Sequence, residues 1–326
     1  MLIPFIVIII GFIVLVLSAD RFVAGAAAVA ENWGMSPILI GLTIVSLGTS
    51  APEILVSINA AFANQAALAV GNALGSNIAN IGLVLGITAL FCPLPVMPGL
   101  LKREFPILLV VTFGAGFLLL DNYLGRMDGV ILITVLIIIL ARLISSQSHN
   151  PSAAEKAEGE QLPHMTQKKA WLSFAIGLVF LVLSSKVLVW GAIELATLLG
   201  VSTLIIGLTV VAVGTSLPEL AATLTCALKG HNEIAIGNVV GSNMFNLMAV
   251  MAIPGIIRPS PLAEQVLLRD YTTMSGLTFL LACSLYASWF LRRNNNSIDL
   301  HRVGRGMGAL LITLYGMYYY WIFITH

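Results

Sequence analysis

The chain has 326 residues, of which 58% are hydrophobic and only 10% are charged, with a formal net charge of +1. Soluble domains carry about 25% charged residues, so this composition predicts an all-α polytopic membrane protein and excludes a separate soluble domain. The basic residues are spread over loops without a basic face, which excludes a nucleic-acid partner. The three cysteines lie singly in apolar stretches and are interpreted as small buried residues.

Ten apolar runs follow one another along the chain, each close to the roughly 20 residues that cross a hydrocarbon core. They lie at 3–29, 36–63, 70–91, 103–120, 127–145, 170–195, 202–228, 235–257, 268–291 and 303–324. The first run has no basic segment before it, so we interpret it as a retained span. The polar stretch 146–169 is interpreted as a flexible linker that separates two halves of five spans, 1–145 and 170–326.

Two polar motifs of the first half recur in the second half at the same offset of 166 residues. GLTIVSLGTSAPE at 41–53 matches GLTVVAVGTSLPE at 207–219 at nine of thirteen positions. GNALGSNIAN at 71–80 matches GNVVGSNMFN at 237–246 at six of ten positions. Because shared composition does not place Gly, Thr, Ser, Pro, Glu and Asn in the same order, the chain contains an internal repeat.

An odd number of spans in each half means that the second half enters the membrane from the opposite side. The chain is therefore predicted to form two inverted five-helix repeats, whose motif segments 41–80 and 207–246 meet near the bilayer midplane. With the termini outside, eleven basic residues lie in inner loops and three in outer loops. The inner set is Lys102, Arg103, Arg142, Lys156, Lys168, Lys169, Lys229, Arg292, Arg293, Arg302 and Arg305, and the outer set is Arg126, Arg258 and Arg269. Both termini are thus predicted outside, and the linker is predicted to be cytoplasmic.

A proline in each motif is expected to break its helix. Proline lacks an N–H and clashes with the carbonyl four residues back, so Pro52 is expected to free the carbonyl of Gly48, as Pro218 frees that of Gly214. Free carbonyls at membrane depth face protein or line a hydrated cavity, where they can coordinate cations. A threonine lies four residues before each glutamate and on the same helical face, Thr49 before Glu53 and Thr215 before Glu219.

The second motif adds neutral oxygen ligands along one helical face. Its polar residues are spaced by four, as Asn72, Ser76 and Asn80 in the first half and Asn238, Ser242 and Asn246 in the second. Together with two carboxylates they form an all-oxygen set of formal charge −2. Calcium takes about 6–8 oxygen ligands and tolerates irregular geometry, whereas zinc and copper favour the Cys and His that the motifs lack. The motifs therefore indicate a site for a hard cation.

Structural roles compete with this interpretation. Proline can simply kink a membrane helix, and glycine with serine can simply let helices pack closely. A buried acidic residue, however, costs about 2.5–3.5 kcal/mol on insertion scales, and packing does not explain two of them at matched positions. For Asn72 and Asn238, a role in tying helices together remains an alternative to ion binding.

GTSAPE with GNALGSN, and GTSLPE with GNVVGSN, resemble the two α-repeats of the calcium/cation antiporter superfamily. The likeness is strongest to its bacterial sodium/calcium exchanger branch, which is similar to the potassium-dependent exchangers of animals, and it covers essentially the whole chain. The calcium/proton branch centres its repeats on a GNxxE pattern that is absent here. The resemblance implies the sodium/calcium exchanger fold, with ten transmembrane helices in two inverted repeats, in a bacterial inner (plasma) membrane.

The resemblance also implies roles for the motif residues. The calcium ligands would be Glu53 and Glu219, with carbonyl and hydroxyl oxygens of Thr49 and Thr215, while Ser76 and Ser242, helped by Ser50 and Ser216, would line sodium sites, and Asn80 and Asn246 would lie at the centre. Many relatives, notably the potassium-using exchangers, carry aspartate at the position of Asn80 or Asn246. Both are asparagine here, which leaves potassium dependence and coupling stoichiometry open.

We expect alternating-access antiport, in which either calcium or several sodium ions neutralise Glu53 and Glu219. The first and sixth spans lack the ion motif and are the candidate moving part. Exchange of three sodium ions for one calcium would move one net charge, worth about 2.3 kcal/mol per 100 mV. No nucleophile with a base, phosphate loop or cofactor fingerprint is present, so neither an enzyme nor a cofactor is predicted, and no obligate protein partner is evident.

Three alternatives remain on sequence grounds. A cation/proton antiporter would use the same two glutamates as proton carriers. A cation channel would need a continuous pore, often built from several chains. A structural or receptor membrane protein would need a sizeable soluble surface, which this chain lacks.

Overall fold

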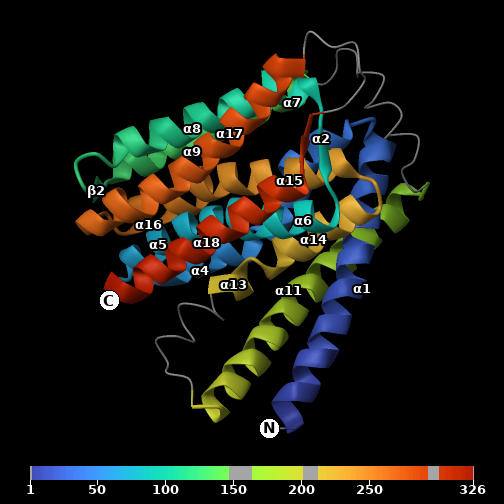
Figure 1. The fold of residues 1–326 in the computed structure, drawn as a ribbon, viewed down its shortest axis with the longest axis horizontal. Helices are drawn as coiled ribbons and strands as arrows, with labels where there is room; N and C mark the ends of the chain where they lie inside the picture. The colour runs from blue at the N-terminus through green and yellow to red at the C-terminus, as the bar shows by residue number, and fades with distance from the viewer. Residues whose placement is uncertain (1, 147–163, 201–211, 293–300, 326) are drawn as a thin grey trace.

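The computed structural model describes residues 2–146, 164–200, 212–292 and 301–325 (Figure 1). In the first half it forms α1 (Leu2–Trp33), α2 (Pro37–Ile40), η1 (Gly41–Val45), α3 (Ser46–Thr49), α4 (Ala51–Phe62), α5 (Ala66–Ala79), η2 (Asn80–Leu85), α6 (Gly86–Phe91), β1 (Leu94–Val96), α7 (Pro98–Lys102), α8 (Glu104–Leu118), β2 (Tyr123–Leu124) and α9 (Arg126–Ser146). In the second half it forms α11 (Gln167–Leu198), α13 (Ala212–Thr215), α14 (Leu217–Leu228), α15 (Asn232–Phe245), η4 (Asn246–Val250), α16 (Met251–Ile257), β3 (Ser260–Pro261), η5 (Val266–Tyr271), α17 (Thr272–Arg292), β4 (His301–Val303) and α18 (Arg305–Thr325). The η elements are π-helical turns, and most of the predicted linker 146–169 lies outside the described residues.

Seven helices in the described ranges are long and apolar enough to cross a membrane, and the bent pair Pro37–Thr49 and Ala51–Phe62 gives an eighth span. The seven are Leu2–Trp33, Ala66–Phe91, Arg126–Ser145, Gln167–Leu198, Asn232–Ile257, Val266–Phe290 and Arg305–Ile324. Of the two other predicted spans, 103–120 corresponds to α8, which is only 15 residues long. The other, 202–228, begins outside the described residues and continues as α13 and α14. The chain is therefore a helical, multi-pass membrane protein.

The repeat seen in the sequence is reproduced in the helix boundaries. Helices α4 and α14 both have 12 residues and α5 and α15 both have 14, and each pair is related by the offset of 166. In both halves the second of these helices passes into a π-helical turn that begins at an asparagine, Asn80 or Asn246. The equal boundaries show that the same local signals, a proline near each helix start and the same polar spacing, produce the same local structure twice.

Two short ribbons join the halves. Strand β1 pairs with β4 in antiparallel register, with Leu94 opposite Val303, and β2 pairs with β3, with Tyr123 opposite Pro261. Each ribbon takes one strand from each half of the chain. The sequence analysis did not predict them, because a two- or three-residue strand leaves no alternating pattern in an apolar chain.

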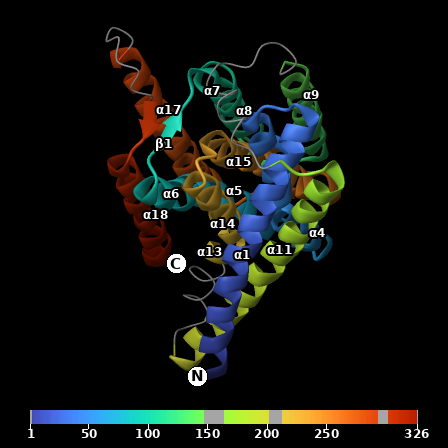
Figure 2. The same ribbon diagram turned by 90° about the vertical axis from the view of Figure 1, so that its right-hand side faces the viewer.

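Helices α1 and α11 form a long pair whose lower ends extend away from the other helices (Figures 1 and 2). Their backbones approach closely where each carries a glycine. A Cβ on Gly25 would lie 2.3 Å from the backbone nitrogen of Phe174, and one on Gly177 would lie 2.4 Å from that of Phe22. Small residues at such crossings are typical of membrane helix pairs, whose association depends on close packing.

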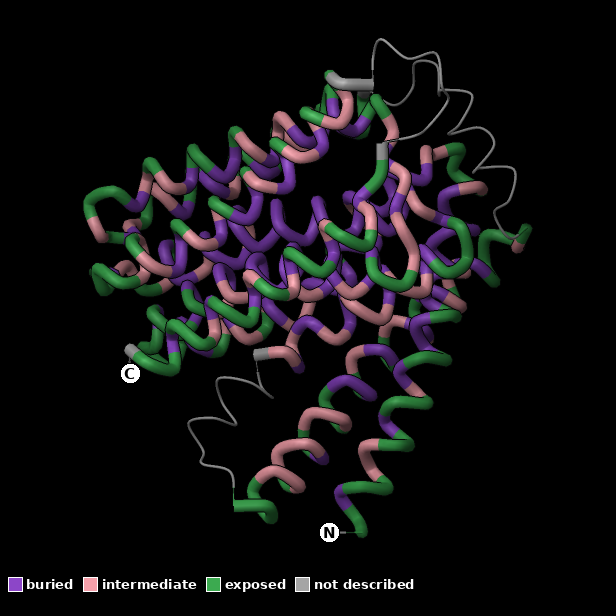
Figure 3. The backbone as a smooth tube through the Cα atoms, viewed as in Figure 1, coloured by how far each residue is buried: buried purple, intermediate pink, exposed green. Residues whose placement is uncertain are grey.

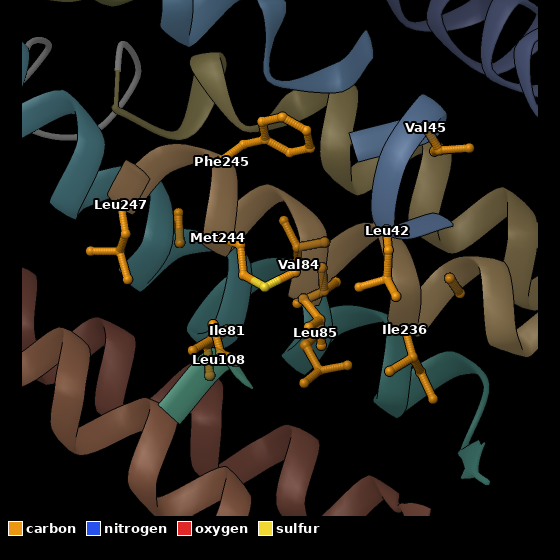
Figure 4. Close-up of a cluster of buried hydrophobic side chains, with 14 of the residues drawn as sticks. Leu42, Val45, Ile81, Val84, Leu85, Leu108, Ile236, Met244, Phe245 and Leu247 are labelled. Carbon is orange, nitrogen blue, oxygen red and sulfur yellow. The ribbon is translucent and has the colours of Figure 1, made fainter. Parts of the chain in front are cut away.

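Buried residues concentrate in the middle of the molecule (Figure 3), whereas the long helices such as α1, α9 and α11 expose many large apolar side chains. The central cluster combines residues of both halves (Figure 4), namely Leu42, Val45, Ile81, Val84, Leu85 and Leu108 with Ile236, Met244, Phe245 and Leu247. In a bilayer the hydrophobic effect between helices is weak, so this packing stabilises mainly by van der Waals contact. It fixes the polar motif helices of the two halves against one another.

Candidate ion-binding site

The Pro–Glu pair of each repeat lies in the first turn of a new helix, α4 in the first half and α14 in the second. The chain turns at Ser50 (φ −82°, ψ 3°) and Ser216 (φ −90°, ψ 5°), and the following helices carry proline at their start and a glutamate in the first turn. The segment before Ala51 is bent by 45° relative to α4. The predicted helix break is therefore confirmed in the first half. A helix start also presents free N–H groups and a partial positive charge, which favour a carboxylate in the first turn.

The two carboxylates are completely enclosed, with Glu53 0% and Glu219 1% exposed. Oε1 of Glu53 accepts a hydrogen bond from Ser76 at 3.5 Å, and Oε1 of Glu219 accepts one from Ser50 at 3.4 Å. Neither Oε2 atom has a hydrogen-bond partner among the described residues, and the two carboxylates are near enough for their charges to interact. Two buried carboxylates, each with one oxygen that has no partner among the described residues, require further positive charge, because an uncompensated buried charge is strongly destabilising.

Asn80 and Asn246 each begin a turn that packs against the glutamate-bearing helix of the other half. Both are buried, at 1% and 0% exposure, and neither side chain has a partner for its oxygen or nitrogen among the described residues. Asn80 begins η2, which packs against the helix of Glu219, and Asn246 begins η4, which packs against the helix of Glu53. The arrangement brings one amide of each half beside the carboxylate helix of the other half, where amide oxygens can serve as cation ligands.

Thr49 links the two halves at the same depth. Its hydroxyl, fully buried, donates to Oδ1 of Asn238 at 3.1 Å and lies 3.4 Å from the hydroxyl of Ser242. Its counterpart Thr215 is the last residue of α13 and is half-buried. The hydroxyl of Ser216 is buried and has no partner among the described residues.

The structure distinguishes Asn72 from Asn238, which the sequence treats alike. Asn238 is fully buried, accepts from Thr49 and donates to Oγ1 of Thr223 at 2.8 Å, so both its polar atoms bind protein groups. Asn72 is only half-buried and donates to the backbone oxygen of Glu53 at 3.4 Å. Asn238 therefore ties helices together, the alternative left open by the sequence, while its role as a cation ligand stays a prediction.

The carbonyl of Gly214, four residues before Pro218, also has a protein partner. Gly214 lacks a helical donor because Pro218 has no N–H, and its oxygen instead accepts the hydroxyl of Ser185 on α11 at 3.0 Å. In the first half, the N–H of Ser50 donates to the carbonyl of Ser46 at 2.9 Å. The Gly214 carbonyl therefore connects the motif to α11, and its expected role toward a cation stays a prediction.

Four further buried polar residues were missed by the sequence analysis. Ser57 donates to the backbone oxygen of Val250 at 2.7 Å, and its repeat counterpart Thr223 accepts from Asn238. Asn77 donates to the backbone oxygen of Asn243 at 3.2 Å, and the side-chain oxygens of both asparagines have no partner among the described residues. Each pair is related by the offset of 166, and that offset, applied to every polar residue of the motif helices, was the signal that would have found them.

Comparison with known proteins matches these features to one family. The family model described as "Sodium/calcium exchanger protein" covers residues 3–145 and 169–324. CaxA of Alkalimonas amylolytica is 40% identical over 99% of both chains, and "Inner membrane protein YrbG" of Escherichia coli (strain K12) is 37% identical over 95% of this chain and 94% of its own. "Sodium/calcium exchanger MaX1" of Methanosarcina acetivorans is 31% identical over 89% of this chain and 93% of its own.

A solved structure of the sodium-calcium exchanger NCX_Mj, soaked with 2.5 mM Na⁺ and 0.1 mM Ca²⁺, superposes with a TM-score of 0.79. The match covers 97% of both chains at 29% sequence identity. Family model, relatives and structure therefore agree over nearly the whole length, including both motif segments. On this evidence the chain belongs to the sodium/calcium exchanger protein family.

Proposed function

We propose that this protein is a secondary antiporter that exchanges calcium for sodium by alternating access. The observation that carries the proposal is the pair of buried glutamates, each with a carboxylate oxygen that has no partner among the described residues. Its support from outside the chain is the family and the relatives named as sodium/calcium exchangers. The proposed activity is transport, with calcium and sodium as cargo and no covalent step.

The proposed mechanism follows from charge balance. Glu53 and Glu219 contribute a formal charge of −2 in a site without other carboxylates among the motif residues, so one calcium ion neutralises them. Sodium ions bound to the same oxygens achieve the same compensation, aided by the hydroxyls of Ser50 and Ser76. Because both cargos use the same two carboxylates, they compete, and the protein changes the side from which the site is accessible with one cargo or the other bound. This competition couples the two ion gradients.

Potassium is not part of the proposal. The two central positions, Asn80 and Asn246, carry neutral amides, so the site lacks the additional negative charge that a further cation would require. We therefore propose that exchange proceeds without potassium.

We further propose that α1 and α11 are the moving part. They pack along one another and carry none of the motif residues (Figure 2). The pair packs against α14, and two of its polar contacts reach the second motif: Ser185 of α11 donates to Gly214, and Asp20 of α1 forms an ion pair with Lys229, directly after α14, at 2.5 Å. A displacement of the pair would break and re-form these contacts while the ion site stays in place.

The proposed location is the inner, or plasma, membrane of a bacterium, with both termini outside and the linker inside. Its basis is the excess of basic residues in the loops assigned to the inside and the relative named as an inner membrane protein.

Calcium flux into proteoliposomes tests the proposal, with sodium, potassium and proton gradients imposed separately. We expect an outward sodium gradient alone to drive calcium uptake. Uptake driven by a proton gradient without sodium would instead establish a cation/proton antiporter, and uptake without any counter-gradient, at rates that do not saturate, would establish a channel.

A further inference from the structure

An apolar groove of about 470 Å³ opens between α8 and α9, and neither of the two motif glutamates is among the described residues that line it. Both helices pack against η4, and the groove is lined by residues of α8 and α9 together with Met248 of η4; Figure 1 shows where the two helices lie. Its walls are Val110, Gly114 and Leu118 of α8 and Ile131, Val135 and Ile138 of α9. Because Val110 is 72% and Ile138 51% exposed, the groove opens on the outer face of the helices, which in a multi-pass membrane protein faces lipid.

The dimensions of the groove match one leaflet of a bilayer. It extends along α8 from Pro106 to Leu118, a length of about 18 Å at about 1.5 Å per residue. Half of a hydrocarbon core of about 30 Å is about 15 Å. A single acyl chain lying along the groove would therefore fill it from the leaflet surface to the midplane.

The groove is polar at one end only. Arg142 is the one charged residue among the described residues that line it, and it lies near the end of α9 that the loop charges assign to the cytoplasm. Arg142 is exposed, so its guanidinium can reach the headgroup layer and form bidentate hydrogen bonds to a phosphate. The groove wall also includes Met248, which lies two residues after Asn246 in η4. An occupant thus contacts the turn that carries a candidate ion ligand.

We propose that this groove is a binding site for an anionic phospholipid of the cytoplasmic leaflet, with one acyl chain between α8 and α9 and its phosphate at Arg142. The apolar walls, the length of one leaflet and the single cation at the headgroup end together fit this ligand. A second copy of the chain, or another hydrophobic helix, would leave the terminal arginine without an anionic partner.

Gly114 offers a way to fill the groove without disturbing the fold. It is exposed, and a Cβ built on it meets no atom within 4 Å. Gly114→Trp therefore places an indole in the path of the acyl chain. Gly316→Trp on α18 is its matched control, because Gly316 is likewise exposed with no atom within 4 Å of a Cβ. Arg142→Gln removes the cation, and Arg126→Gln, at the opposite end of α9, is the control for charge.

The test is native mass spectrometry of full-length protein released from nanodiscs of equimolar phosphatidylglycerol and phosphatidylcholine with identical acyl chains. We expect the wild-type protein and both controls to retain one phosphatidylglycerol, Gly114→Trp to retain none, and Arg142→Gln to lose about fivefold of the preference for the anionic lipid. Equal retention of both lipids by the wild type, or wild-type retention by Gly114→Trp, would overturn the proposal. A dimer that Gly114→Trp dissociates would also overturn it, by making the groove a protein interface. Lipid retention is read without transport, so failure here is distinguishable from failure of the proposed exchange.

Discussion

The two ion motifs have nearly the same sequence, yet their glutamates are held by different hydrogen bonds. Glu53 accepts from Ser76 of its own half, whereas Glu219 accepts from Ser50 of the other half. The repeat counterparts of Ser76 and Ser50, which are Ser242 and Ser216, do not form the equivalent bonds. Ser242 contacts Thr49, and Ser216 has no partner among the described residues. The symmetry of the sequence is therefore broken in the contacts.

The contact to the long helix pair differs as well. Ser185 of α11 donates to the motif carbonyl of Gly214, but the residue 166 positions earlier, on α1, is Ala19, which has no hydroxyl. Inverted repeats that alternate in access are expected to be unequal in any one conformation. The serine pairs can exchange between conformations, whereas the difference between Ser185 and Ala19 is fixed by the sequence.

The largest expected effect on calcium uptake comes from replacing the glutamate that both halves share. Glu53→Gln and Glu219→Gln should each lower sodium-driven calcium uptake by more than about a hundredfold, because each removes a charge from a buried ion contact worth about 3 kcal/mol or more. Glu194→Gln on α11, an exposed carboxylate outside the motifs, is the control and should transport normally. Wild-type uptake by either glutamine variant would refute the site.

The serine asymmetry can be tested with Ser50→Ala and Ser216→Ala. If the unequal contacts belong to one of two alternating conformations, both variants should reduce calcium uptake by about tenfold, since each removes a hydrogen bond to a charged group in one of the two states. Uptake kinetics at varied calcium concentration provide the measurement. An effect of Ser50→Ala alone would show that the asymmetry is permanent.

A smaller effect is expected at the contact to α11. Ser185→Ala removes the donor to Gly214, a bond worth about 0.5–1.5 kcal/mol, and should change the uptake rate by about two- to tenfold. Ser184→Ala is matched in position and burial, but among the described residues the Ser184 hydroxyl bonds only to Leu181 of its own helix. Equal rates for the two variants would remove Ser185 from the proposed coupling.

The smallest effect concerns the loops before α5 and α15, where Gln65 in the first half corresponds to His231 in the second. Burial, together with the charge of Lys229, lowers the pKa of His231 from its ordinary value of 6.5. The folded protein thus binds this proton less readily than the unfolded chain does, so its stability falls as pH decreases below about 6.5. His231→Gln should flatten this dependence in thermal unfolding measured between about pH 5 and 7. An unchanged pH profile would contradict the assignment.

Much of the fold follows from local signals in the sequence. The offset of 166 predicts equal helices at α4 and α14 and at α5 and α15, and the Pro–Glu order predicts where they begin. The family resemblance read from the same motifs is confirmed by the family model and by the NCX_Mj structure.

What the sequence does not predict are the partners of individual polar groups. Asn72 and Asn238 occupy equivalent positions, yet only Asn238 meets two hydroxyls, Thr49 and Thr223. The bond from Ser185 to Gly214 joins helices whose contact depends on their tilt and crossing point. Such contacts arise from the register between helices far apart in the chain, and an almost uniformly apolar sequence carries little information about that register.

The central claim is that Glu53 and Glu219 form one shared cation site. Calcium binding to the purified protein, measured by titration calorimetry at several sodium concentrations, tests it most directly. The account predicts one calcium ion per chain, competitive displacement by sodium, and loss of binding in Glu53→Gln and in Glu219→Gln alike. Calcium binding that persists in either single variant, or that sodium does not displace, would contradict it.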